Sequence, residues 1–91
     1  MDVDEQLTRA ERARGLLENP LYQEAFAVLR AEIQSQWSRS VVGETVQREN
    51  LWLMLRLLDK LQGHLKNLVE NGKIISQRLA DIEKQRKLWR R

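Results

Sequence analysis

The sequence predicts an all-α protein of three helices whose long C-terminal helix associates with other copies of the chain. Apolar residues recur at helical spacing along most of the 91 residues, and no proline follows Pro20. In addition, LWLMLRLL, from Leu51 to Leu58, contains seven large apolar residues and one arginine. Such a run must be buried against a membrane, inside a small bundle, or against other copies.

A membrane span is excluded by length, because eight residues are far fewer than the roughly 20 that cross a bilayer. Charged residues also flank the run on both sides. The first 15 residues, MDVDEQLTRAERARG, are too polar for a secretory signal. Since the chain also has no cysteine, we expect a cytoplasmic protein without disulfides or thiolate metal sites.

A first amphipathic helix is predicted from about residue 3 to 17. Asp2 followed by Glu5 is typical of a helix N-cap with a capping box. The apolar stripe of this helix is thin, so we expect it to fray more readily than the rest. The stripe consists of Leu7, Ala10, Ala13 and Leu17.

A second helix is predicted from about residue 20 to 38, roughly 28 Å long. Asn19 can cap it, and proline suits its first position. The following stretch SRSVVGE interrupts the helical pattern and indicates a loop, after which Thr45 can cap the next helix. The apolar stripe of the second helix is Tyr22, Phe26, Leu29, Ile33 and Trp37.

The third helix carries a coiled-coil seam, and ten of its twelve seam positions are large and apolar. We expect one continuous helix from about 45 to 88, because the seven-residue repeat passes through Gly72 without a slip. The alternative is a turn at Asn71-Gly72 that folds the last residues back as a hairpin. The seam positions are Leu51, Met54, Leu58, Leu61, Leu65, Leu68, Gly72, Ile75, Leu79, Ile82, Arg86 and Trp89.

The chain is expected to form one domain over residues 1–91: a short helix (1–18), a helical hairpin (19–71) and a basic extension (72–91). A continuous third helix would be roughly 66 Å long, more than twice the second helix. Its seam beyond Gly72 would then have no partner in the same chain. Since a buried Leu or Ile contributes about 1.5 to 3 kcal/mol, we expect homo-oligomerisation through Leu51, Met54, Leu58, Leu61, Leu65, Leu68, Ile75, Leu79 and Ile82. Copy number and helix orientation stay open.

No catalytic, cofactor or metal site is predicted. His64 is the single histidine, whereas a zinc site needs several ligands. There is no nucleophile motif and no glycine-rich phosphate loop. The carboxylates alternate with Lys and Arg, as expected for solvated helix faces.

Charge is unevenly distributed along the chain. Residues 1–45 contain five Arg and eight acids, a net charge of −3, whereas residues 46–91 contain eleven Lys plus Arg and five acids, a net charge of +6. The final KQRKLWRR combines cations with an aromatic ring, as in nucleic-acid contacts. The alternative is that these cations complement the helix dipole. The candidate DNA-binding residues are Lys84, Arg86, Lys87, Trp89, Arg90 and Arg91.

The segments ENPLYQEAF and RENLWLMLRLLDKLQGHLKNLVENGK resemble short helical proteins of tailed bacteriophages and prophages that look like small terminase subunits. The resemblance covers about residues 16 to 73. It implies a ring or bundle with helical hairpins at its centre, acting in a bacterial host cell, with viral DNA and the packaging ATPase as partners.

The chain departs from many small terminases, because it has no room for a helix-turn-helix domain before Asn19. DNA contact would then depend on the basic rear residues. We therefore expect a non-enzymatic, oligomeric protein that assists phage DNA packaging. The main rival is a protein-binding module, an inhibitor or adaptor of a host or viral enzyme that does not bind DNA. A small helical enzyme would need a pocket with converging polar groups, which the sequence does not indicate.

Overall fold

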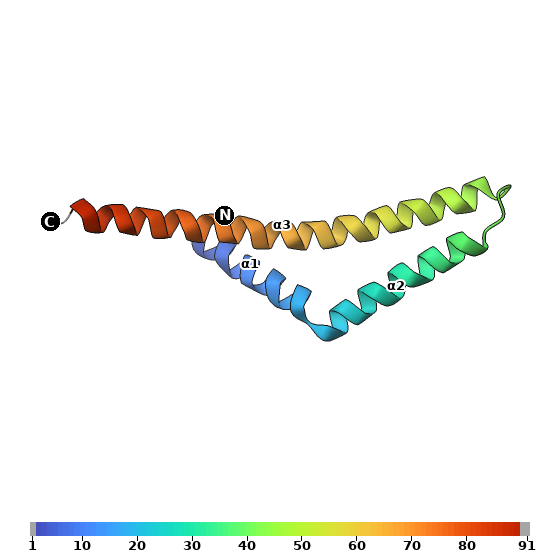
Figure 1. Cartoon of the computed structure of the whole chain (residues 1–91), viewed down its shortest axis with the longest axis horizontal. Coiled ribbons are helices and arrows are strands. Elements are labelled where there is room, and N and C mark those ends of the chain that lie inside the picture. The colour runs from blue at the N-terminus through green and yellow to red at the C-terminus, as the bar shows by residue number, and fades with distance from the viewer. Residues whose placement is uncertain (1, 90–91) are drawn as a thin grey trace.

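The computed structural model describes residues 2–89 as three α-helices that form an open triangle (Figure 1). They are α1 (Val3–Glu18), α2 (Pro20–Arg39) and α3 (Thr45–Trp89). The predicted all-α fold is confirmed, and each helix begins and ends within one residue of its predicted bounds. α3 forms the long side of the triangle, and α1 and α2 form the two short sides.

α3 is one uninterrupted helix of 45 residues that passes through Asn71 and Gly72. The alternative of a hairpin at this point is therefore wrong. None of the glycines in residues 2–89 has a positive φ, so Gly72 does not act as a helix stop. At 1.5 Å per residue α3 is about 68 Å long, which accounts for most of the 74 Å length of the molecule.

The first two helices begin as the sequence predicts. The Asp2 carboxylate accepts a hydrogen bond from the Glu5 backbone N–H at 2.7 Å. The Asn19 side chain accepts from the N–H groups of Leu21 at 2.8 Å and Tyr22 at 3.2 Å. Thr45 was predicted to be the N-cap of α3. It is instead the first residue of the helix, so the predicted cap position is wrong by one residue.

α1 packs against α3 through small residues. Ala10 and Ala13 are buried, and so is Gly72 on the facing side of α3. A Cβ atom placed on Gly72 would overlap the Cβ of Ala10. The α1 stripe was expected to be a thin packing surface, yet small side chains let the two helices approach very closely. α1 also carries its own ion pair, between Arg14 and Glu11.

α2 approaches α3 at the loop that joins them and diverges from it toward Pro20 (Figure 1). No residue of α2 is buried. Tyr22, Phe26 and Ile33 of its apolar stripe are half-buried, and the Tyr22 and Phe26 ring centroids lie 6.2 Å apart. An ion pair between Arg30 and Asp59 links α2 to α3.

The molecule is elongated and exposes a large surface for its mass. Its radius of gyration is 20.3 Å, against about 12 Å for a compact domain of this length. Its accessible surface is 7633 Å², whereas a compact protein of 10.8 kDa exposes about 5,500 Å². In residues 2–89 the only buried large apolar side chain is Leu51. Within the same residues, no helix has the length and apolar character to span a membrane.

Candidate self-association surface and basic helix end

α3 has two apolar faces: its own chain covers one of them, and the other is exposed except where α1 crosses α3 near Gly72. Leu51 is buried, and Leu55, Leu58 and Leu65 are half-buried, on the side where α1 and α2 pack. The second side, here called the open face, consists of residues between 44% and 65% exposed. Successive residues of an α-helix are rotated by 100° around the helix axis. With this rotation, all residues of the open face lie within a sector about 100° wide. The open face is Leu53, Met54, Leu57, Leu61, Leu79 and Ile82.

The nine residues predicted for the oligomer interface are divided between these two faces. Leu51, at 4% exposure, is covered within its own chain. Leu58, Leu65, Leu68 and Ile75 are half-buried. The remaining four, Met54, Leu61, Leu79 and Ile82, belong to the open face.

The expectation that the seam beyond Gly72 has no partner in its own chain needs correction. α1 crosses α3 at Gly72, so this glycine is buried and Ile75 is half-buried. Leu79 and Ile82, which lie farther along α3, are 44% and 56% exposed. The uncovered part therefore begins about one helical turn later than expected.

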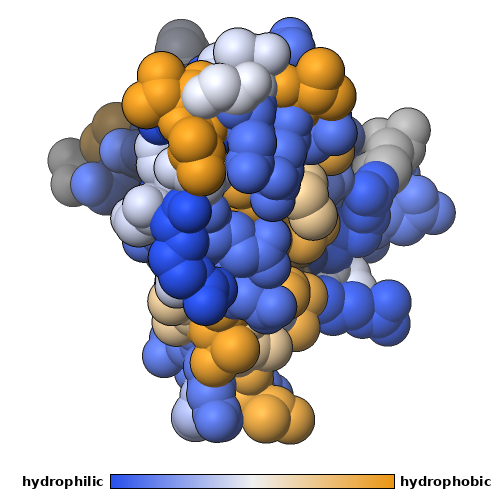
Figure 2. All heavy atoms as spheres, turned by 90° about the vertical axis from the view of Figure 1, so that its right-hand side faces the viewer, coloured by the Kyte–Doolittle hydropathy of each residue, from blue (hydrophilic) through white to orange (hydrophobic). Residues whose placement is uncertain are grey.

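Leu53 and Leu57 lie off the heptad seam but belong to the open face. The signal that identifies them is the continuous run of apolar residues from Leu51 to Leu58, which makes this part of α3 apolar nearly all round. Figure 2, viewed onto the end of the molecule where α2 and α3 are joined, shows orange apolar side chains reaching the surface between blue polar ones.

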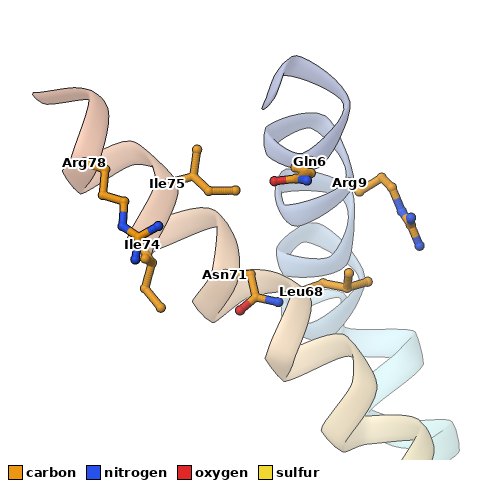
Figure 3. A pocket seen from close by; sticks show the side chains of 7 residues that line it. All are labelled: Gln6, Arg9, Leu68, Asn71, Ile74, Ile75 and Arg78. Atoms are coloured by element: carbon orange, nitrogen blue, oxygen red, sulfur yellow. The ribbon is translucent and has the colours of Figure 1, made fainter. Parts of the chain in front are cut away.

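A groove of about 490 Å³ lies in the angle between α1 and α3. Figure 3 shows Ile75 of α3 directed into this angle, with Gln6 of α1 opposite. Leu68 also lines the groove, and Asn71 and Arg78 supply polar groups. Leu68 and Ile75 fall in the same sector of α3 as the open face, so the groove continues that face toward α1.

A second, smaller groove of about 270 Å³ lies between α2 and α3 near their loop. Trp37 and Trp52 line it. The Arg48 guanidinium lies 4.4 Å from the centroid of the Trp37 ring, and the Arg56 guanidinium lies 5.3 Å from that of Trp52. Both tryptophans are thereby engaged by cations of the same chain.

The predicted DNA-binding residues lie on the last turns of α3. Lys84, Arg86 and Lys87 are exposed, and Trp89 is 88% exposed. Arg86 has an ion-pair partner within its own helix, Glu83 at 3.9 Å. Arg90 and Arg91, the last two predicted DNA contacts, lie outside the described residues.

The side chains of residues 2–89 that could bind a metal do not form a cluster. Within this part of the chain, no three His, Cys, Asp or Glu residues lie close enough together to hold a metal ion. His64 is exposed on α3. The hydrogen bond from the Arg14 guanidinium lowers the pKa of Glu11 on the solvent side of α1. A lowered pKa keeps this carboxylate charged, as a surface ion pair requires.

Comparisons with protein-family models, with curated proteins and with solved structures found no match to this chain.

Proposed function

We propose that this chain is a non-enzymatic helical protein that associates with copies of itself and handles DNA in the manner of a small terminase subunit. The observation that carries the proposal is the surface left uncovered by a single chain. The accessible area of 7633 Å² exceeds that of a compact protein of the same mass by about 2,000 Å². A standard protein interface takes about 800 Å² from each partner, so the excess is sufficient for association.

The character of this surface also favours association. Every residue of the open face is aliphatic, and each side chain that becomes buried contributes about 1.5 to 3 kcal/mol. Monomeric soluble proteins rarely expose contiguous apolar patches of more than a few hundred Å². A second copy of the chain offers an equally apolar surface.

The basic end of α3 supports the DNA part of the proposal. Lys84, Arg86 and Lys87 are exposed close to an exposed tryptophan. Cations bind phosphates and release counterions, and an aromatic ring can pack on a base or sugar. In an assembly each copy contributes one such end, which raises the apparent affinity for one DNA molecule. The partners proposed are double-stranded DNA and a packaging ATPase in the bacterial cytoplasm.

The DNA-binding proposal is tested by DNA retardation at low and high salt. A variant with Lys84→Gln, Arg86→Gln, Lys87→Gln and Trp89→Ala should lose most of its binding. The slope of log K against log salt should fall by about 0.9 for each phosphate contact removed. The matched control, Lys60→Gln, Lys66→Gln and Lys73→Gln, removes the same charge from the middle of α3 and should bind almost as the parent does.

Equal binding by the two variants would show that the basic end is not the DNA contact. If the parent protein itself shows no salt-dependent binding, the DNA role fails. An assembly that does not bind DNA would favour the rival function, a protein-binding inhibitor or adaptor.

A further inference from the structure

Asn71 is the one asparagine of the chain that is followed by glycine, and the pair lies where α1 crosses α3. The side-chain amide of an asparagine can react with the backbone nitrogen of the next residue. Glycine in that next position has no Cβ to hinder the approach and gives the backbone wide conformational freedom. The other asparagines precede proline or leucine, which hinder the reaction. Asn71-Gly72 is therefore the position of this chain that is most favourable for spontaneous deamidation.

The reaction requires only water besides the chain itself. The Gly72 nitrogen forms a bond to the side-chain carbonyl carbon of Asn71, and the bond from that carbon to the amide nitrogen breaks. Ammonia leaves with the proton of the Gly72 nitrogen, and a cyclic imide (succinimide) remains in the main chain. Water then opens the ring at one of its two carbonyls, which leaves an aspartate or an isoaspartate at position 71.

The helical geometry of α3 opposes this reaction. In an α-helix the N–H group of Gly72 donates to the carbonyl of Leu68, so the attacking nitrogen is already engaged. Ring closure also requires the peptide between Asn71 and Gly72 to rotate out of its helical orientation. Access of water is not limiting, because Asn71 is exposed and lines the groove between α1 and α3 (Figure 3). Deamidation therefore requires α3 to open locally at this point.

α1 is the element that packs on α3 at this point. Ala10 of α1 lies so close to the buried Gly72 that a Cβ atom on Gly72 would overlap it. α2 diverges from α3 before this position, and the end of α3 extends past α1 (Figure 1). Glycine is also the weakest helix former apart from proline. Since poorly packed segments open most readily, the contact with α1 is what keeps α3 closed at Gly72.

We infer that Asn71-Gly72 is a deamidation site whose reactivity is controlled by the packing of α1 on α3. With α1 in place the Gly72 nitrogen stays in the helix and the site is protected. Separation of α1 from α3 permits local opening and exposes the site to reaction. This inference does not depend on the function proposed above.

The modification changes both the charge and the backbone of α3. A carboxylate replaces a neutral amide in a groove that Arg78 also lines. Isoaspartate in addition places an extra methylene group in the main chain, which disrupts the pattern of N–H to C=O bonds along the helix. The product therefore interrupts α3 and separates its basic end from the part that packs on α2.

The site is tested by following deamidation with peptide mass spectrometry in neutral buffer, with and without denaturing urea. In the unfolded parent chain, Asn71 should react well before Asn50 and Asn67, which both precede leucine. In the folded parent, Asn71 should react about tenfold more slowly or less, because the reaction waits for local opening. An unfolded chain in which Asn71 reacts no faster than Asn50 and Asn67 would show that it is not the favoured site. Equal rates in the folded and unfolded chains would show that packing does not protect it.

Control by α1 is tested with Ala10→Leu, which overfills the contact with Gly72. This change should raise the rate in the folded protein about tenfold, because overpacking makes α1 separate from α3 more often. Ala27→Leu is the matched control, since Ala27 is exposed on α2 and the change should leave the rate as it is in the parent.

Circular dichroism shows whether each variant keeps its helices. If Ala10→Leu loses them, Leu7→Ala is the milder variant, because it removes a half-buried side chain of α1 that lies beside Gly72. Leu7→Ala should also raise the rate of deamidation. A helical α1 variant that reacts no faster than the parent would overturn control by α1, and so would equal acceleration in Ala27→Leu.

Discussion

At the scale of single residues, the glycines of α3 differ in what surrounds them, although the sequence makes them look alike. Gly63 has open space where a Cβ would lie, whereas a Cβ on Gly72 would overlap Ala10. Replacing glycine by alanine inside a helix contributes about 1 kcal/mol through backbone entropy. Forcing a methyl group into a filled contact costs about 1 to 3 kcal/mol.

We therefore expect Gly63→Ala to raise the free energy of unfolding by about 1 kcal/mol. The free energy of unfolding of the Gly72→Ala variant should be about 1 to 3 kcal/mol lower than that of the Gly63→Ala variant, because α1 must move away from α3. Urea unfolding of the two variants at equal protein concentration measures the difference. Equal stabilisation by both substitutions would mean that Ala10 and Gly72 are not in contact.

Asn19 gives a second prediction at this scale, since its side chain accepts hydrogen bonds from two backbone N–H groups of α2. Asn19→Ala should lower the free energy of unfolding by about 1 kcal/mol. Asn19→Asp keeps a side-chain oxygen that can accept these hydrogen bonds, so this variant should lose far less stability. Thermal or urea unfolding followed by circular dichroism checks this, and an Asp variant as unstable as the Ala variant would argue against a capping role.

At the scale of elements, α1 and α2 are attached to α3 in different ways. α1 is attached by the close contact of small residues around Ala10 and Gly72. α2 has no buried residue and relies on half-buried apolar side chains and on the ion pair between Arg30 and Asp59. We expect α2 to separate from α3 more readily than α1 does.

The contribution of the Arg30–Asp59 pair can be measured in a double-mutant cycle with Arg30→Gln and Asp59→Asn. Both side chains are more than one third exposed, so the coupling energy should be only about 0.2 to 1 kcal/mol. It should fall toward zero in 1 M salt because exposed charges are screened. A coupling energy that salt does not change would indicate a contact protected from solvent.

The helices and their bounds follow from sequence because periodicity, capping residues and Pro20 are local signals. The heptad repeat through Gly72 correctly predicted one continuous α3. The crossing of α1 at Gly72 could not be predicted, since it depends on the angle between two helices that are distant in sequence. For the same reason the repeat alone did not show that Leu51 is covered within the chain while Met54, which follows it on the seam, is exposed.

At the scale of the whole molecule, one chain leaves more apolar surface uncovered than its own helices can bury. Its radius of gyration is 20.3 Å, and the open face covers much of the length of α3. If copies supply the missing cover, folding is linked to association, and the thermal midpoint depends on concentration. We expect the midpoint to rise measurably over a hundredfold increase in protein concentration. A midpoint that stays constant would indicate that each chain unfolds by itself.

The most direct test of self-association is the mass of the purified protein in solution, measured by light scattering coupled to size-exclusion chromatography. A single chain has a mass of 10.8 kDa. The uncovered face of α3 predicts, at micromolar concentration, a mass of two chains or a larger multiple. A uniform species of one chain at the same concentration would contradict self-association through α3.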